Sequence, residues 1–491
     1  CISPMNRCWG RALMRMAQGL TMGEPTKIAN PLLAGAGGVT LGEARTNHQG
    51  RKAILMIRNE ENSGEFEALV ATMGIEIVER INQSGKEDPR SYFGKGRLQD
   101  VADELAATVD GHPWKSVDLV LIHNNAAARQ LVAVSDAVKV EVWDRVRLLL
   151  SLFTSHASSM EARTQVRIAQ LQSDRTVLRE LVNLQTTGER AGYGSSGATA
   201  LQAVMENLNR EIASLAKRQQ RHANAQSERR RQRTRSGAQT VGIAGYTNAG
   251  KSSLFLALSG KEVLIEDKLF STLETTVGRL EASPRVLLAD TIGFIDELPN
   301  ATLEAFRATL SEALECELLL ILADASDPPL ELERKLFTSR REVFERLFGE
   351  DLDDDFPWRN DEMSVKQQIM VVLTKIDKAT PHQLEEAKAT VAALALPEPI
   401  LISSHSGKGM QNLKDRILFY LFGPPLHLQI LPPENYATER AVAGYVSDLH
   451  NAGLVTDYLL LEDGSVDMTI WVSEAEISKL LAKSGARIVI K

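Results

Sequence analysis

Residues 242–255, GIAGYTNAGKSSLF, place two glycines, a lysine and two hydroxyl side chains directly after a short apolar stretch. The spacing of Gly245 from Gly250, Lys251 and Ser252 fits a phosphate-binding loop. Glycines let the backbone approach a phosphate, the loop amides point at it, and a lysine neutralises its charge. The alternative is an ordinary strand-to-helix turn that contains glycines. The complete pattern favours a nucleoside triphosphate site, with Lys251 as a catalytic cation and Ser252 as a ligand of Mg²⁺.

A second apolar segment, residues 285–290, ends in a carboxylate. Asp290 closes this segment, and Gly293 follows three residues later. We expect Asp290 to orient Mg²⁺ through water and the Gly293 amide to reach a γ-phosphate. Gly293 is therefore a second catalytic candidate.

Two later apolar segments, 368–374 and 399–403, end in residues suited to a guanine base. Asp377 follows the first, and a carboxylate accepts both N–H donors on one edge of guanine, a pair that adenine lacks. After the second, residues 403–405 are placed where backbone amides reach the guanine carbonyl oxygen. Thr374 stands where GTPases usually carry asparagine, so we expect guanine preference to rest mainly on Asp377.

Residues 267–276, DKLFSTLETT, lie between the phosphate loop and Asp290 and are polar and threonine-rich, as a mobile switch should be. We expect Thr272 to supply the second Mg²⁺-binding hydroxyl and to act as a catalytic residue, with Thr275 and Thr276 as competitors. Ordering by the γ-phosphate and release after hydrolysis would make the segment a switch. The predicted nucleotide-binding residues are Gly245, Tyr246, Thr247, Asn248, Ala249, Gly250, Lys251, Ser252, Ser253, Phe270, Ser271, Thr272, Leu273, Glu274, Asp290, Thr291, Ile292, Gly293, Thr374, Lys375, Ile376, Asp377, Ser403, Ser404 and His405.

The bulk properties suit a multidomain protein in a reducing compartment. At 491 residues, 43% hydrophobic and 24% charged, the chain is too long for one core. Three cysteines cannot form a disulfide framework, and the longest apolar runs are too short to span a membrane. The net charge of −8 argues against a uniformly basic surface for nucleic acid, although it leaves room for a local basic patch.

We predict five segments. Residues 1–50 form a disordered start and linker; residues 1–23 contain three arginines and no acidic residue, which resembles an organelle transit peptide, with chance composition as the alternative. Residues 51–150 alternate strand-like runs (53–57, 76–81, 118–123) with helical patterns (66–74, 98–108) and predict a small α/β domain. Inside it, Lys95 and Arg97 belong to SYFGKGRL, interpreted as a basic, flexible turn before a helix and a candidate RNA contact.

Residues 151–237 show heptad-like spacing on both sides of a helix-breaking stretch, 186–198, and predict a helical hairpin. Residues 217–235 carry eight Lys or Arg against one acid. A solvated helix end explains such a run equally well, but its density in an acidic protein suits a phosphate backbone. Arg229, Arg230 and Arg231 are the candidate RNA contacts here.

Residues 238–423 alternate strands and helices and predict a doubly wound sheet, with strands at 240–245, 285–290, 318–324, 368–374 and 399–403. An acidic insert at 350–362 is expected to be a solvated loop. Residues 424–491 contain a helical pattern (441–453) and a hairpin (455–464 with 465–472), which predict a small α+β domain. The expected fold class is thus multidomain α/β: an α/β domain, a helical hairpin, a doubly wound P-loop domain and a small α+β domain.

The phosphate loop GYTNAGKSS, the switch FSTLETT and residues 290–313 together resemble the HflX-type GTPases. SYFGKGRL resembles that family's N-terminal Gly-Lys-Gly signature, and residues 144–172 resemble its entry into the hairpin, so the likeness covers roughly residues 52–425. The resemblance implies a ribosome-associated GTPase that binds the large ribosomal subunit and its RNA. It also implies ribosome-stimulated hydrolysis that accompanies subunit splitting, rescue or assembly.

Two features bear on mechanism. The family's hairpin tip carries an Arg-Gly-Pro-Gly-Glu core, which residues 188–202 of this chain lack, so action at the peptidyl-transferase region does not follow. Phe294 stands where many GTPases place a water-orienting glutamine, a replacement that the family shares. A phenyl ring cannot orient water by hydrogen bonding, so we expect slow, partner-dependent intrinsic hydrolysis.

The function expected from these residues is Mg²⁺-dependent GTP hydrolysis on the large ribosomal subunit by a monomeric protein, with GTP and GDP as ligands and a mitochondrial location. A cytoplasmic location is the alternative. A second hypothesis is an RNA-binding assembly factor that uses GTP as an occupancy signal with little turnover. A third, a pseudo-GTPase scaffold, conflicts with the intact Lys251, Ser252, Asp290 and Asp377.

Overall fold

The structure is a computed structural model that describes residues 47–59, 62–106, 111–157, 159–186, 195–235, 237–261, 276–290, 293–294, 316–348, 368–432, 442–484 and 487–491. The chain divides into two compact units, residues 1–151 with 170–212, and residues 152–169 with 213–491. The predicted start and linker (mostly residues 1–46), most of the switch and the acidic insert lie outside the described residues. Among the helices described, none is both long and apolar enough to cross a membrane.

The first unit contains a parallel sheet of order β2-β1-β3-β4. Its strands are β1 (Lys52–Arg58), β2 (Glu76–Gln83), β3 (Val117–Ile122) and β4 (Glu141–Trp143). β1 and β3 are almost continuously apolar and buried, as expected for parallel strands covered on both faces. The accompanying helices are α3 (Gly64–Thr72), α4 (Lys95–Ala106) and α5 (Ala128–Val138).

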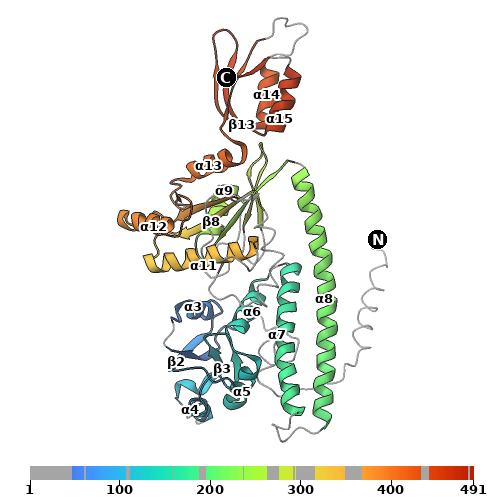
Figure 1. Cartoon of the computed structure of the whole chain (residues 1–491), viewed down its shortest axis with the longest axis vertical. Coiled ribbons are helices and arrows are strands. Elements are labelled where there is room, and N and C mark those ends of the chain that lie inside the picture. The colour runs from blue at the N-terminus through green and yellow to red at the C-terminus, as the bar shows by residue number, and fades with distance from the viewer. Residues whose placement is uncertain are drawn as a thin grey trace, which may run out of the picture. The chain divides into compact units, whose positions relative to one another are not determined.

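Two long helices follow α6 (Arg145–His156). They are α7 (Met160–Thr186) and α8 (Ser195–Arg235), which Figure 1 shows as single unbroken rods. Near the start of α7 and the end of α8, His222 Nδ1 lies 3.0 Å from Glu161 Oε1, so the two helices run antiparallel there. The predicted helix break at 186–198 is too long, because residues 195–198 already belong to α8 and their two hydroxyls and one glycine do not stop it.

The nucleotide-type sheet lies in the second unit and has the order β10-β9-β8-β5-β7-β6. All neighbours are parallel except β6, which pairs antiparallel with β7. The central strand β5 (Gln239–Gly245) lies between β7 (Val286–Asp290) and β8 (Leu318–Asp324). The remaining strands are β6 (Thr276–Glu281), β9 (Gln368–Thr374) and β10 (Ile400–Leu401).

Helices cover both faces of this sheet. Apolar residues of α9 (Lys251–Ser259) and α13 (Met410–Phe422) join one core cluster with β5, β7 and β8. Those of α11 (Pro329–Phe348) and α12 (Pro381–Ala393) join a second cluster with β8 and β9. The doubly wound prediction is therefore confirmed, and β5 leads into a loop at the point where the strand order reverses, the usual ligand position. The predicted strand 399–403 shrinks to two residues, because residues 402–408 turn instead.

The C-terminal residues form an antiparallel sheet of order β12-β13-β11-β14. Its strands are β11 (Leu426–Ile430), β12 (Gly453–Leu460), β13 (Val466–Val472) and β14 (Ile488–Ile490). Helices α14 (Val442–Ala452) and α15 (Glu474–Ser484) pack their apolar sides on one face. The predicted hairpin is β12–β13, whereas β11, β14 and α15 had no matching prediction because their apolar runs are short.

Candidate phosphate and guanine site

The loop after β5 has a backbone that requires glycine at both of its ends. Gly245 has φ +147°, and a Cβ there would lie 2.4 Å from the carbonyl oxygen of Leu322 on β8. Gly250 has φ +85° and caps the start of α9. The loop therefore passes close to the neighbouring strand. The N-terminus of the nine-residue helix α9 faces the concave side of the loop, which is the arrangement that binds phosphate.

Lys251, the first residue of α9, lies inside this loop with 7% of its surface exposed. Its Nζ donates to the carbonyl oxygens of Gly245, at 3.1 Å, and Tyr246, at 2.7 Å. Burial lowers the pKa of Lys251 to about 8, while the charge of Asp290 opposes that shift. The cation is therefore held at the centre of the loop and is poorly solvated, which strengthens its attraction for an anionic ligand.

The two residues predicted to serve Mg²⁺ are brought together. Ser252 Oγ donates to Asp290 Oδ2 at 3.0 Å, and Asp290 is fully buried at the end of β7. A hydroxyl and a carboxylate are hard oxygen donors of the kind that Mg²⁺ prefers. Among the described residues no group of three or more His, Cys, Asp or Glu could hold a metal ion.

Phe294 is hydrogen-bonded to the phosphate loop, and Gly293 lies beside the lysine of that loop. Phe294 N donates to Gly245 O at 3.0 Å, and Thr247 N donates to Phe294 O at 2.8 Å. A Cβ on Gly293 would lie 2.8 Å from Lys251 Nζ and 3.0 Å from Thr247 Cα, so a larger residue here would displace the lysine or the loop. Phe294 is 1% exposed, so its ring fills the interior beneath the loop.

Thr374 and Lys375, at the end of β9, also contact the phosphate loop. Thr374 Oγ1 donates to the carbonyl oxygens of Ala249, at 2.9 Å, and Ala323, at 3.1 Å. Lys375 Nζ donates to Asn248 O at 2.8 Å and pairs with Asp324 Oδ2 at 2.7 Å. These bonds tie β8 and β9 to the loop. The Thr374 hydroxyl thus serves as the hydrogen-bond donor to the loop carbonyl of Ala249.

Asp377 is exposed beyond the end of β9, beside the turn 403–408. A hydrogen bond from the side chain of Ser403, first, and the charges of His405 and Lys378 lower the pKa of Asp377. Ser403 is itself fixed, because Ser406 N donates to its Oγ and its own N donates to Lys408 O. The carboxylate is therefore ionised and oriented, as recognition of two N–H donors demands.

Several predicted site residues lie outside the described part of the chain. These are Phe270, Ser271, Thr272, Leu273, Glu274, Thr291 and Ile292. The roles of Thr272 and of the switch stay predictions. Thr276, one of the competing hydroxyls, is the first residue of β6.

Helix α11 contacts the phosphate loop through two cations, which the sequence pattern did not predict. The Arg334 guanidinium lies 5.3 Å from the centre of the Tyr246 ring and donates to its hydroxyl at 3.2 Å. Lys335 Nζ lies 5.7 Å from the same ring. Glu331 and Asp327 hold the two cations, at 2.7 and 2.8 Å. The signal in the sequence was the pair of adjacent cations in the helix after β8, which looks like any solvated helix face.

The candidate RNA contacts lie on helices. Lys95 and Arg97 are in the first turn of α4, so the predicted flexible turn is wrong: Gly96 is helical and only Gly94 precedes the helix. Arg229, Arg230 and Arg231 belong to α8, where the Arg231 side chain is exposed. Their roles stay predictions.

Two family models match the chain. One, described as "50S ribosome-binding GTPase", matches residues 240–348, and the other, described as "GTP-binding GTPase N-terminal", matches residues 60–154. The first match starts in β5 and includes the phosphate loop and Asp290. The second covers most of the N-terminal sheet.

Curated proteins called GTPase HflX are similar over most of the chain. The protein of Methanocaldococcus jannaschii is 30% identical over 409 residues, which cover 82% of this chain and 91% of the relative. That of Gluconacetobacter diazotrophicus is 30% identical over 458 residues, 92% of this chain and 91% of the relative. That of Escherichia coli is 32% identical over 274 residues, 55% and 63% of the two chains.

Solved structures show a more distant likeness. A GTP-binding protein from Sulfolobus solfataricus in complex with GDP is 22% identical, with a TM-score of 0.39 over 76% of this chain and 98% of that one. The structure titled "crystal structure of SsGBP and GDP complex" is also 22% identical, with a TM-score of 0.42 over 75% and 97%.

Proposed function

Since this chain belongs to the HflX family of GTPases, and therefore binds and hydrolyses GTP, we propose that it does so on the large ribosomal subunit. The observation that carries the proposal is the phosphate loop. It holds Lys251, Ser252, Asp290 and Gly293 together inside the region matched by a ribosome-binding GTPase model. Within the site, one group of residues binds the phosphates of GTP and another binds the guanine base.

At the phosphate end, Lys251 supplies the charge that faces the β- and γ-phosphates. Ser252 Oγ and Asp290, 3.0 Å apart, would hold Mg²⁺ directly and through water, and that ion would neutralise charge on the phosphates. The Gly293 amide would donate to the γ-phosphate, because Gly293 lies beside Lys251 Nζ. At the base end, Asp377 accepts the two N–H donors of guanine.

The environment of Phe294 supports stimulation by a partner. Its ring is buried and its backbone is bonded to the loop, so it offers no side-chain donor or acceptor to an attacking water. A residue or RNA group from outside would have to position that water. We propose that the large subunit supplies this group and that hydrolysis accompanies subunit splitting, rescue or assembly.

The second candidate is an assembly factor that uses GTP as an occupancy signal with little turnover. The departure of residues 188–202 from the family's tip core favours it. The two candidates predict different particles: splitting acts on intact ribosomes, and assembly requires association with immature subunits.

Sedimentation of the tagged full chain with a non-hydrolysable GTP analogue tests the proposal. We expect the protein to move with the large subunit in the presence of the analogue and to leave it when GDP replaces the analogue. Migration with small subunits only, or nucleotide-independent migration, would contradict the proposal.

The basic end of α8 provides a finer test. Replacing Arg229, Arg230 and Arg231 with glutamine should weaken binding to the large subunit most at low salt and flatten its salt dependence, because fewer counterions are released. A control with the same charge change replaces the exposed Lys479 and Lys483 and the partly buried Lys388 with glutamine. Equal sedimentation of both triple variants across a salt series would show that the arginines are only a solvated helix end.

We propose that the protein is located in an organelle, because residues 1–23 are rich in arginine and contain no acidic residue, as in transit peptides. Fusion of residues 1–50 to a fluorescent protein tests this. Import into mitochondria is the expected result, and a diffuse cytoplasmic signal would favour the alternative.

A further inference from the structure

Strand β12 forms one edge of the C-terminal sheet and, among the described residues, pairs with β13 alone. Three consecutive apolar side chains near its end are more than half exposed: Tyr458 at 52%, Leu459 at 60% and Leu460 at 62%. An edge strand offers backbone N–H and C=O groups to any chain that can pair with them, and exposed apolar side chains make that pairing favourable.

The exposed apolar side chains lie on both faces of the strand. Leu459 is opposite Asp467, on the face that α14 and α15 leave open. Tyr458 and Leu460 are opposite Met468 and Val466, which belong to the core beneath those helices. Because side chains alternate along a strand, one added strand would cover apolar surface on both sides of the sheet.

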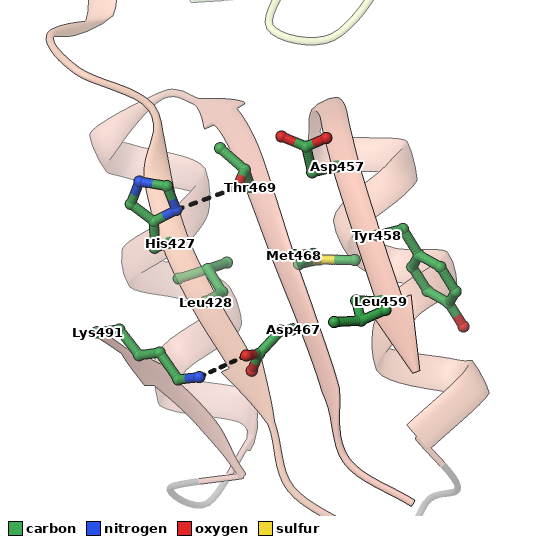
Figure 2. Close-up of a pocket in the computed structure, with 9 residues that line it drawn as sticks. All are labelled: His427, Leu428, Asp457, Tyr458, Leu459, Asp467, Met468, Thr469 and Lys491. Atoms are coloured by element: carbon green, nitrogen blue, oxygen red, sulfur yellow. Dashed lines mark hydrogen bonds and ion pairs between the residues drawn. The ribbon is translucent and has the colours of Figure 1, made fainter. Parts of the chain in front are cut away.

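The open face beside β12 is hollowed rather than flat. The hollow has a volume of about 570 Å³ and runs from Asp457 and Leu459 on β12 across β13 to His427 and Lys491 (Figure 2). Figure 2 shows two bonded pairs of side chains in the hollow: His427 with Thr469, at 3.0 Å, and Lys491 with Asp467, at 2.6 Å. The one lysine of the hollow is thus neutralised by a neighbouring carboxylate.

The charge around β12 is negative. Residues 453–466, which include β12 and the turn to β13, contain three acidic residues and no Lys or Arg, whereas Asp467 on β13 is paired with Lys491. Asp457 lies in β12, and Glu462 and Asp463 follow in the turn to β13. Such a surface repels a phosphate backbone and attracts a cationic segment.

We propose that β12 is a docking edge for a partner protein, which adds an extended segment containing lysine or arginine to the sheet as an extra strand. Main-chain hydrogen bonds to β12 supply affinity, and apolar side chains of the segment cover Tyr458, Leu459 and Leu460. Its cations meet the carboxylates of Asp457, Glu462 and Asp463. This surface is separate from GTP hydrolysis and does not depend on the ribosomal proposal.

The test uses the full chain and a synthetic peptide of about ten residues in which Lys and Val alternate, with a Glu-for-Lys peptide as control. We expect the Lys peptide to bind and to slow amide hydrogen exchange in residues 453–460. Leu459→Lys should weaken binding at least tenfold by placing a like charge at the edge. The matched control, Val489→Lys on the other edge strand and 41% exposed in the parent, should change it less than twofold.

A double variant, Asp457→Asn with Glu462→Gln, covers the case in which Leu459→Lys fails to fold; it should weaken binding and reduce its salt dependence. GTP affinity reports folding in every variant. The proposal is overturned if the Lys peptide does not bind, if the Glu peptide binds equally, or if protection appears at β14. It is also overturned if the chain dimerises through β12 and Leu459→Lys abolishes that dimer, because the occupant is then a second copy.

Discussion

In the described part of the chain, two sheets consist wholly or mainly of parallel strands, and one of them carries the phosphate loop. In the N-terminal sheet, β3 leads into α5 through His-Asn-Asn-Ala-Ala, residues 123–127, which contain neither glycine nor lysine. In the other sheet, β5 leads into α9 through a loop that needs Gly245 and Gly250 and contains Lys251.

The N-terminal turn is closed by acceptors of the protein itself. Ala126 N donates to Asp144 Oδ2 at 3.3 Å, and Ala127 N donates to Gln130 Oε1 at 2.8 Å. Burial raises the pKa of Asp144, because desolvation disfavours its charged carboxylate in the interior. In the phosphate loop the charged group inside is a cation instead. The parallel sheet therefore only places the turn, and the residues of the turn decide whether an anion can bind.

The largest expected effect compares two of the Gly-Lys dipeptides in the chain, Gly250-Lys251 and Gly94-Lys95. Lys251→Ala should weaken GTP binding by on the order of a hundredfold, because it removes the buried charge facing the phosphates. Lys95→Ala, which removes the lysine after Gly94 in the N-terminal domain, should leave GTP affinity of the free protein unchanged. Titration with a fluorescent GTP analogue measures both. Near-normal affinity in Lys251→Ala would refute the phosphate-loop assignment.

The next effect concerns the base. Asp377→Asn should lower the preference for GTP over xanthosine triphosphate by about thirtyfold, roughly 2 kcal/mol, because an amide cannot accept both donors. Asp415→Asn, on α13, is the matched control. Competition binding gives the ratio directly, and an unchanged ratio would remove Asp377 from the guanine site.

A smaller effect follows from the pKa of Lys251, which burial lowers to about 8. Phosphate binding needs the ammonium form, and the free protein loses that proton as the pH rises through 8. GTP affinity should therefore fall about fourfold from about pH 7 to about pH 8.5, with proton uptake on binding at the higher pH. Calorimetry in two buffers of different ionisation enthalpy detects the uptake; a constant affinity without uptake would place the pKa elsewhere.

The smallest effect tests the support from α11. Arg334→Ala should weaken GTP binding about threefold, since a cation over an aromatic ring contributes about 0.5–1 kcal/mol at exposed sites. Arg341→Ala, on the same helix and 3.9 Å from Glu342, should change nothing. If both variants match the parent, Tyr246 keeps the loop in place without the cation.

The fold class and the phosphate loop could be predicted because both depend on local pattern: apolar runs of strand length and glycines at fixed spacing. The contact of Arg334 with Tyr246 could not, because it joins positions 88 residues apart and adjacent cations on a helix carry no positional signal. Strands such as β14, with three residues, could not be found either, since they are defined by the partner strand rather than by their own sequence. Gly96 led to an error of the opposite kind: a glycine usually indicates a loop, but here it lies in the first turn of α4.

The central claim is that the phosphate loop hydrolyses GTP when the large ribosomal subunit completes the site that Phe294 leaves without a water-orienting group. The most direct measurement is the steady-state kcat for GTP with and without purified large subunits, beside small subunits and the Lys251→Ala variant. We expect kcat to rise about tenfold or more with large subunits, to stay unchanged with small subunits, and to be undetectable in the variant. Equal rates with and without large subunits would contradict it.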